Sequence, residues 1–327
     1  MAWAGSQERA GGASKVTVAG AGLVGSTAAY SMMVRGLVSE LVLIDVNHDR
    51  ADGEAMDLNH ALPFGKPARI RAGDYADAAG SDIVVLAAGA AQKAGESRLS
   101  LAATNVEITR QIVAQLEPVA PDAILLVVAN PVDILTYAAL KASSYPPERV
   151  IGSGTLLDTA RLRSELSRHC GFAPQNIHAY VVGEHGDSEV PVWSLANVAG
   201  MRLRDYCPTC GRDCDQGELD QLFENVRTAA YRIIELKGAT YYAIALGVAR
   251  LVEAILRDEH TVMTVSTLVD GYGGIRDVCL SLPAVIHRGG IHRTIPLDLA
   301  PGEQAALRRS ADTLKTILRS VGLQAKP

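Results

Sequence analysis

The sequence has no apolar run long enough to cross a membrane as a helix. Its longest apolar run, Ala123 to Ala129, has the length of a buried strand. Basic residues are not in excess either, because 31 Lys and Arg stand against 36 Asp and Glu, a net charge of -5. The basic residues are also dispersed along the chain. The sequence therefore indicates neither a membrane protein nor a nucleic-acid-binding protein.

Cysteine is scarce as well. Five cysteines in 327 residues are too few for a disulfide scaffold, and an odd number cannot pair completely. Cys207, Cys210 and Cys214 are close enough in sequence to suggest a zinc knuckle or a redox pair. A structural zinc site takes four ligands, usually as two spaced pairs, and no second Cys/His pair of suitable spacing follows. We therefore expect a solvent-exposed loop with reduced thiols, and no metal site.

The N-terminal segment is rich in Gly, Ala and Ser and has no apolar core of the kind found in a secretory signal. We expect residues 1–14 to form a flexible tail and the protein to be cytoplasmic. The chain is 48% hydrophobic and long enough for more than one core. Two domains are expected, at residues 15–154 and 155–327.

A nucleotide-binding pattern opens the first of these domains. The strand-like run Lys15 to Ala19 is followed by Gly-Ala-Gly-Leu-Val-Gly and then by a helical pattern to about Arg35. In this pattern Gly20 permits the tight turn and Gly22 lets the backbone approach a pyrophosphate. Gly25 lets the helix pack closely on the strand. The order strand, glycine turn, helix predicts a dinucleotide site.

A second strand-like run, Glu40 to Asp45, ends on an acid 20 residues after the last glycine of the pattern. This spacing suits a carboxylate that binds the ribose hydroxyls. Since a 2′-phosphate would meet like charge at Asp45, NAD is predicted rather than NADP. Arg50 is the only nearby residue that softens this preference.

Further along, strand-like and helical patterns alternate, which predicts a Rossmann-type doubly wound parallel sheet, an α/β fold. The expected strands cover residues 68–72, 82–87, 123–128 and 150–152, and the expected helices cover 50–60 and 101–117. After Leu156 the pattern becomes mixed and indicates a second, α+β domain that binds substrate. There we expect helices at 156–170, 218–235, 241–256 and 301–321, strands near 178–182 and 261–268, and a hairpin at Gly289-Gly290.

The segment Gly183-Glu184-His185-Gly186-Asp187-Ser188 places one histidine among small and acidic neighbours. Histidine can give and take a proton near neutral pH, so His185 is a candidate acid or base. Taken alone, the segment also fits a surface loop. Its position downstream of a dinucleotide pattern favours a proton donor that works beside a hydride carrier.

Five motifs follow one another in a fixed order: Ala87 to Arg98, Val128 to Asp133, Leu157 to Arg163, Gly183 to Ser188 and Lys237 to Tyr242. On these motifs the chain resembles the lactate/malate dehydrogenase family from about Lys15 to Val321. The resemblance implies an NAD-dependent dehydrogenase that interconverts pyruvate and L-lactate in glycolysis and fermentation. A malate or other 2-hydroxy-acid dehydrogenase is the alternative, and an NAD-binding protein without activity is a third possibility.

The resemblance also implies roles for four charged residues. His185 would donate the proton to the substrate carbonyl, and Asp158 would orient it. Arg98, on a mobile loop, would polarise the carbonyl. Arg161 would hold the substrate carboxylate, and an arginine fork suits that task because it offers two parallel hydrogen bonds. Out of context, Asp158 and Arg161 also fit an ordinary ion pair three residues apart on a helix.

Further positions are implied by the same resemblance. The substrate side would include Gln92, Asn130 and Thr240, with a cis bond between Asn130 and Pro131. The cofactor side would include Gly20, Gly22, Leu23, Val24, Gly25, Asp45, Gly89, Asn105 and Ser153, with Ile244 beneath the nicotinamide ring. Any of the weaker candidates also fits a plain packing or turn residue.

Gln92 decides between substrates, because relatives that act on malate carry arginine at this position. A dicarboxylate next to a neutral amide would leave its second charge without a partner. Pyruvate is therefore the expected substrate. Arg163 and His178 match the pair that binds fructose 1,6-bisphosphate in allosteric bacterial members, although a surface arginine and an unrelated strand histidine fit as well. The resemblance implies a homotetramer activated by this sugar bisphosphate.

Overall fold

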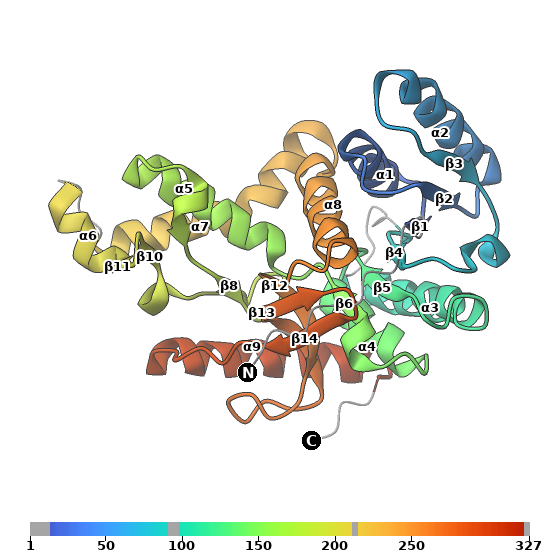
Figure 1. Ribbon diagram of the computed structural model, residues 1–327. Coiled ribbons are helices and arrows are strands. Elements are labelled where there is room, and N and C mark those ends of the chain that lie inside the picture. The colour runs from blue at the N-terminus through green and yellow to red at the C-terminus, as the bar shows by residue number, and fades with distance from the viewer. Residues whose placement is uncertain (1–13, 91–97, 211–214, 324–327) are drawn as a thin grey trace, which may run out of the picture.

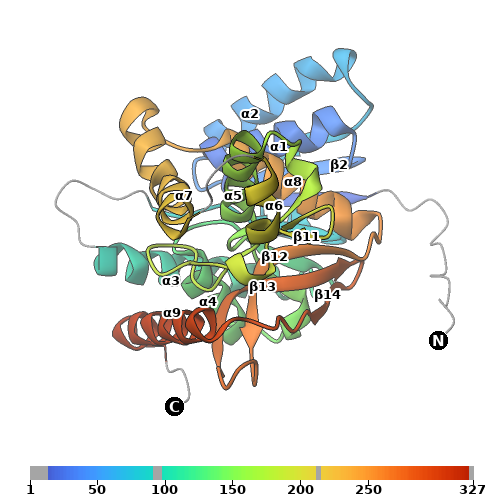
Figure 2. The same ribbon diagram turned by 90° about the vertical axis from the view of Figure 1, so that its left-hand side faces the viewer.

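The computed structural model describes residues 14–90, 98–210 and 215–323 (Figure 1). A wide sheet runs through the molecule, with helices on both of its faces, as Figures 1 and 2 show from two sides. No helix among the described residues is both long enough and apolar enough to span a membrane. The peptide bond between Asn130 and Pro131 is cis, as expected.

Six parallel strands form the N-terminal part of this sheet. They are β1 (Lys15–Ala19), β2 (Glu40–Ile44), β3 (Arg69–Ala72), β4 (Ile83–Leu86), β5 (Ile124–Val127) and β6 (Val150–Gly152). Their order is β3-β2-β1-β4-β5-β6, which is the order of a dinucleotide-binding sheet. The predicted fold class is confirmed. The order reverses between β1 and β4, so a ligand crevice is expected at the carboxyl ends of these strands.

The helices cover both faces of the sheet. They are α1 (Leu23–Arg35), α2 (His48–Ala61), α3 (Arg98–Leu116), α4 (Val132–Lys141), α5 (Leu156–Cys170), α6 (Leu203–Cys210), α7 (Gln216–Lys237), α8 (Tyr242–Leu256) and α9 (Pro301–Ser320). Single 3-10 turns cover Leu62–Phe64, Tyr75–Ala78, Pro147–Arg149, Pro174–Asn176 and Trp193–Leu195. Buried side chains of α1, α2 and α8 form one core against the sheet, and those of α3, α4 and α9 form the other. Burial on both faces explains the unbroken apolar runs of the central strands.

The sheet does not end with β6. Three antiparallel strands, β12 (Thr261–Val269), β13 (Val278–His287) and β14 (Gly290–Thr294), extend it to nine strands. The link is the pairing of Gly152 with Ser266. A Cβ atom added at Gly152 would lie 2.8 Å from the Cβ of Ser266, so glycine allows this close approach. The two predicted domains therefore share one sheet.

A smaller layer lies beside α5 and α7. It holds a three-stranded sheet of β7 (Ile177–His178), β10 (Asn197–Val198) and β11 (Met201–Arg202), and a pair formed by β8 (Val181–Val182) and β9 (Val190–Pro191). Leu162, Leu166 and Val226 are buried in the core between these elements. This layer fixes α5, the helix that carries two of the predicted site residues.

Two features differ from the expectations. The predicted cysteine loop is wrong for Cys207 and Cys210, which lie in α6, whereas Cys214 lies outside the described residues. Pro208 removes one backbone hydrogen bond from α6, which disfavours this eight-residue helix without preventing it. The predicted hairpin at Gly289-Gly290 is confirmed, since β13 pairs with β14 there, but the ten-residue length of β13 was not predicted. This strand holds Pro283, a residue that normally argues against a central strand.

Candidate active site

The centre of the candidate site is a contact between a histidine and an aspartate that are 27 residues apart. His185 lies in the turn after β8, and its Nδ1 is 2.5 Å from Oδ2 of Asp158, in the first turn of α5. The side chain of Asp158 is only 3% exposed, whereas that of His185 is 26% exposed. Since Nδ1 faces the carboxylate, Nε2 is the nitrogen that remains for a substrate.

The environment of this pair favours the protonated imidazole. Burial lowers the pKa of His185, but the charge and hydrogen bond of Asp158, with a further contribution from Asp133, raise it to about 9. The pKa of Asp158 is lowered overall: burial raises it, but the imidazole and the Arg161 guanidinium outweigh burial. At neutral pH the pair is therefore an imidazolium beside a carboxylate, ready to donate a proton.

Arg161 lies against the same carboxylate. Its Nη1 donates to Oδ1 of Asp158 at 2.9 Å, and its side chain is 16% exposed. Asp158 thus binds the histidine with one oxygen and the arginine with the other. The structure brings together three of the predicted residues, His185, Asp158 and Arg161.

Two acids of this site were missed by the sequence analysis. Asp133, in the first turn of α4, accepts a hydrogen bond from the backbone N–H of His185 at 2.7 Å through Oδ2. Its Oδ1 has no hydrogen-bond partner among the described residues, and burial raises its pKa to about 6. The signal in the sequence is the acid that closes the Val128 to Asp133 motif.

Glu189 is the second missed acid. It follows the Gly183 to Ser188 segment directly and is 8% exposed. A carboxylate oxygen of Glu189 and ligand atoms of Asp158 and His185 all lie within 4.8 Å of one another. Burial first, and then the charge of Asp158, raise the pKa of Glu189 to about 9. At neutral pH Glu189 is therefore a neutral acid beside a charged pair.

These three groups are poor candidates for holding a metal ion. Metal ligands must give up their protons, but both His185 and Glu189 keep theirs at neutral pH. The cluster suits proton transfer better than metal binding.

The cofactor side lies at the carboxyl ends of β1 and β2. Gly20 has a φ of +106°, and a Cβ atom there would lie 2.4 Å from the backbone nitrogen of Ala88. A Cβ atom at Gly22 would meet nothing within 4 Å in the part of the chain that the structure describes. Asp45 accepts the backbone N–H of Ala21 at 2.8 Å, which holds its carboxylate beside the glycine turn. The turn has the space and the acid that a bound NAD requires.

The other predicted cofactor positions surround this edge. Leu23 is exposed and Val24 is half-buried at the start of α1, where Gly25 is buried. A Cβ atom at Gly25 would lie 1.8 Å from the carbonyl oxygen of Gly20, so only glycine permits this packing. Ser153 is buried just after β6.

Asn105 connects the segment after β4 with the segment after β5. This buried residue of α3 accepts the backbone N–H of Ala90 at 2.7 Å, next to Gly89, and donates to the carbonyl oxygen of Asn130 at 2.8 Å. Thr240 is half-buried just before α8, and Ile244 is half-buried within it. The predicted roles of these residues toward substrate or cofactor stay predictions.

Two predicted residues cannot be placed. Gln92 lies outside the described residues, and Arg98 is described only as the first residue of α3, without its side chain. Their roles at the substrate stay predictions.

Arg163 belongs to α5, and His178 belongs to β7. Nε of Arg163 donates to the carbonyl oxygen of Ala179 at 3.1 Å, and the guanidinium lies 5.4 Å from the centre of the Tyr180 ring. Burial lowers the pKa of Arg163. His178 is exposed on β7. The structure thus places the Arg163 guanidinium against Ala179 and Tyr180, the two residues that follow His178, while the effector remains a prediction.

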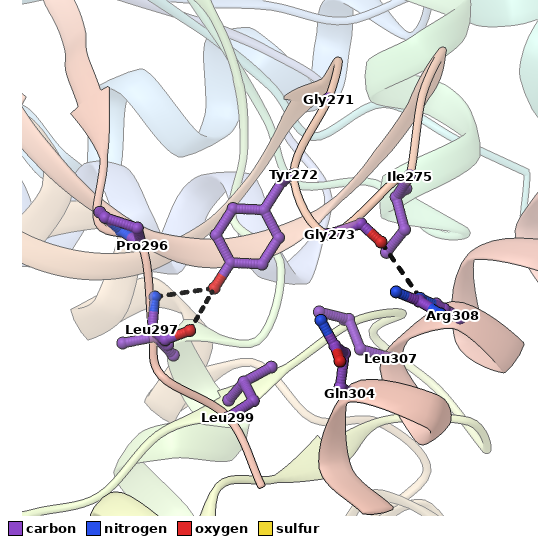
Figure 3. Close-up of a pocket in the computed structure, with 10 residues that line it drawn as sticks. All are labelled: Gly271, Tyr272, Gly273, Ile275, Pro296, Leu297, Leu299, Gln304, Leu307 and Arg308. Atoms are coloured by element: carbon purple, nitrogen blue, oxygen red, sulfur yellow. Dashed lines mark hydrogen bonds between the residues drawn. The ribbon is translucent and has the colours of Figure 1, made fainter. Parts of the chain in front are cut away.

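A separate cavity of about 370 Å³ lies between the loop after β12 and helix α9 (Figure 3). Tyr272 reaches across it, and its hydroxyl accepts the backbone N–H of Leu297 at 2.8 Å. Nε of Arg308 donates to the carbonyl oxygen of Gly273 at 3.1 Å. None of the residues that line this cavity is a predicted site residue, so it is distinct from the catalytic pair.

Comparison with known proteins agrees with this geometry. Residues 14–152 match the model of the lactate/malate dehydrogenase NAD binding domain, and residues 155–322 match that of the lactate/malate dehydrogenase alpha/beta C-terminal domain. An L-lactate dehydrogenase of Acetivibrio thermocellus is 51% identical over 94% of this chain and 98% of its own length. One of a Thermoanaerobacter species is 50% identical over 94% of this chain and 99% of its own length.

Solved structures agree as well. A lactate dehydrogenase from a Medee basin deep-sea metagenome library has a TM-score of 0.92 and 43% identity, covering 95% of this chain and 99% of its own. The minor L-lactate dehydrogenase of Enterococcus mundtii has a TM-score of 0.92 and 40% identity, covering 94% and 98%. Both family models and nearly the whole length of these relatives are thus matched, and this chain belongs to the lactate/malate dehydrogenase family.

Proposed function

We propose that this protein is an NAD-dependent L-lactate dehydrogenase, which reversibly converts pyruvate, NADH and a proton into L-lactate and NAD⁺. The observation that carries the proposal is the convergence of His185 and Arg161 on Asp158 in a chain of this family. Relatives named L-lactate dehydrogenase, about half identical over nearly the whole chain, support the same substrate.

The cofactor supplies the hydride, and the residues of this chain supply the proton and the orientation. The turn at Gly20 to Gly25 and the Asp45 carboxylate would hold the dinucleotide. His185 holds a proton on Nε2, and Asp158 fixes the ring by its contact with Nδ1. The proton passes from Nε2 to the carbonyl oxygen as the alcohol forms.

Arg161 would bind the substrate carboxylate. Its guanidinium has five N–H donors in a planar fork, and Asp158 receives a hydrogen bond from one of its terminal nitrogens. The fork is thereby held in a fixed orientation beside the imidazole. A carboxylate bound to it would have its neighbouring carbonyl next to Nε2, which is what 2-keto acids require.

The alternative is a dehydrogenase that acts on malate or another 2-hydroxy acid. Gln92 favours pyruvate, because a second substrate carboxylate would meet an amide rather than a cation. NADH oxidation measured with pyruvate and with oxaloacetate tests the proposal. A purified protein that binds NADH but oxidises it with neither acid would contradict it.

We further propose that fructose 1,6-bisphosphate activates the enzyme or tightens its homotetramer. The support is the proximity of Arg163, on α5, to the segment that carries His178, since a guanidinium and an imidazole can both donate hydrogen bonds to a phosphate. Activity and oligomer mass are to be measured with and without the effector. An unchanged pyruvate KM together with an unchanged mass would reject this part of the proposal.

We assign the functional division of the chain to residues 15–154 for the cofactor and 155–327 for the substrate; residues 1–13 of the predicted tail lie outside the described residues. The two family matches, which meet between residues 152 and 155, support this division. The expected cytoplasmic location stays a prediction.

A further inference from the structure

Three histidines and one aspartate gather at the far edge of the nine-stranded sheet. Asp258 and His260 lie in the turn between α8 and β12, while His287 ends β13 and His292 belongs to β14. We call this set the imidazole cluster. The elements that carry it are labelled in Figure 1. None of these residues takes part in the proposed reaction.

The cluster is remote from the catalytic pair. Strand β13 passes the active-site turn at Ser281, whose backbone exchanges hydrogen bonds of 2.9 and 2.8 Å with Gly183. His287 lies six residues further along this strand. At about 3.3 Å per residue, this places the cluster about 20 Å from that turn.

The carboxylate and two of the imidazoles are already near the spacing of metal ligands. Oδ1 of Asp258 is 3.6 Å from Nε2 of His260 and 3.9 Å from Nδ1 of His287. All three ligand atoms lie within 4.8 Å of one another. Ligands about 2.0–2.1 Å from a tetrahedral ion are about 3.3 Å apart, so side-chain shifts of well under 2 Å would close the site.

The three rings fit the same ion. Their centroids are 5.4 Å apart for His260 and His287, 5.3 Å for His287 and His292, and 6.1 Å for His260 and His292. Two imidazoles bound to one tetrahedral ion place their centroids about 5 Å apart. His292 is exposed, so its ring can rotate to supply the fourth ligand atom.

The backbone is irregular at each segment that carries a ligand. Asp258 and His260 both have a φ of +53°, in the left-handed region. In the hairpin, Ile291 pairs with Ile286 and Arg293 pairs with Val285, which leaves His292 as the extra residue of a β-bulge. Bulges and left-handed residues commonly re-aim side chains at functional positions.

The backbone holds the carboxylate of Asp258 within the cluster. Oδ1 of Asp258 accepts the backbone N–H of Arg288, the residue after His287, at 2.9 Å.

We propose that the imidazole cluster is a zinc site, with Asp258, His260, His287 and His292 as its ligands. Three nitrogens and one oxygen in a tetrahedral arrangement suit Zn²⁺ better than Mg²⁺ or Ca²⁺, which take oxygen ligands. The ion would tie the edge hairpin of β13 and β14 to the end of α8. Its role is to stabilise this edge, not to take part in catalysis.

The test uses the full chain without a histidine tag, carrying Cys207→Ser, Cys210→Ser and Cys214→Ser so that thiolates cannot bind the metal. After treatment with EDTA, zinc is titrated against a chromophoric chelator, and bound metal is counted by mass spectrometry. We expect one zinc per chain, no competition from excess Mg²⁺, and a rise in Tm that saturates with zinc.

Ligand variants locate the ion. His260→Asn and His292→Asn replace exposed side chains, and asparagine tolerates the left-handed backbone at residue 260. Each should lower the zinc affinity about tenfold or more. His60→Asn, on the exposed surface of α2, is the matched control and should bind zinc like the parent. Circular dichroism confirms that each variant is folded.

Three outcomes would overturn the site: no zinc bound by the folded parent, unchanged affinity in both ligand variants, or affinity lost only in His185→Asn. The last outcome would place the ion at the catalytic pair. Because the readout is metal binding, the result is independent of the proposed dehydrogenase activity.

Discussion

The backbone N–H of His185 donates a hydrogen bond of 2.7 Å to Oδ2 of Asp133, across 52 residues of sequence. This bond ties the histidine turn to α4, the helix that follows the cis Asn130-Pro131 bond. It fixes the main chain of His185, while Asp158 fixes its ring. The position of the imidazole is therefore set from two elements that belong to different family segments.

Replacing Asp133 by asparagine should change how stability depends on pH. The pKa of Asp133 is raised from 3.8 to about 6, so the native state favours the protonated acid. Its favourable contribution is present below pH 4 and is lost as the pH rises through about 6. That loss amounts to about 3 kcal/mol. The asparagine of Asp133→Asn has no proton to lose. The free energy of unfolding of this variant minus that of wild type should therefore increase between pH 4 and pH 7, as measured by denaturant titration.

A control separates charge from geometry at this position. Asp133→Ala removes the acceptor of the His185 amide, so kcat/KM for pyruvate should fall further than in Asp133→Asn. Equal rates in the two variants would mean that the hydrogen bond to His185 does not position the imidazole.

The pH profile of pyruvate reduction should report the imidazole. Because the pKa of His185 is about 9, kcat/KM should be flat near neutral pH and fall as the pH rises through about 9. Asp158→Asn removes the charge that raises this pKa. The fall should then move to lower pH, and kcat/KM at pH 7 should drop about a hundredfold or more. The protonated imidazole of His185 stabilises the fold fully below pH 6.5, and this effect is lost as the pH rises through about 9. The contribution of Asp158 has the opposite sign, since its lowered pKa makes it fully present only above pH 3.8.

NADH binding is the control for this variant, because the side-chain hydrogen bonds of Asp158 in the described part of the chain go to Arg161 and His185, not to the glycine turn. Unchanged NADH affinity with an unshifted pH profile would contradict the assigned role of Asp158.

Glu189→Gln should leave the rate at neutral pH within about threefold of wild type, because Glu189 with a pKa of about 9 is already uncharged there. At alkaline pH the wild-type group ionises in a buried position, and its stabilising effect is lost as the pH rises from 4.5 through about 9. The glutamine variant should therefore have the higher Tm relative to wild type above pH 9. A large loss of activity at pH 7 would instead show that Glu189 is ionised in the working enzyme.

Arg161→Lys keeps the positive charge but removes the fork. Lysine cannot form two parallel hydrogen bonds with a carboxylate, so KM for pyruvate should rise about tenfold to a hundredfold. Steady-state kinetics with a series of 2-keto acids measures this. An unchanged KM would show that the substrate carboxylate is held elsewhere.

Gln92→Arg tests the choice of substrate. The added cation would pair with a second carboxylate, so the ratio of kcat/KM for oxaloacetate to that for pyruvate should rise by tenfold or more. Gln92→Lys is a useful comparison because it adds the charge without the fork. No gain in this ratio for either variant would remove Gln92 as the determinant of specificity.

The sequence predicts those parts of the fold that depend on local pattern. The glycine turn at Gly20 and the acid at Asp45 are spaced along a strand, a turn and a helix, and the structure has all of these elements. The contact between Asp158 and His185 could be named only through family resemblance, since nothing local joins residues 27 apart.

Other features escape the sequence because they depend on packing. Glu189 was not singled out in the sequence, because its role depends on its burial beside Asp158, and burial is what raises its pKa. Gly152 and Ser266 are 114 residues apart in the sequence, and their strands can pair only because a glycine allows the close approach. A pattern within either strand carries no information about its neighbour in the sheet.

The pairing of β6 with β12 limits how the chain can be divided. A cut between residues 152 and 155 would follow the family boundary but would expose the edge of β6 on one fragment and that of β12 on the other. Open edges of this kind recruit further strands. The two fragments should therefore reassociate when expressed together and aggregate when expressed apart. Although the chain matches two family models, its two segments are not two independent folding units.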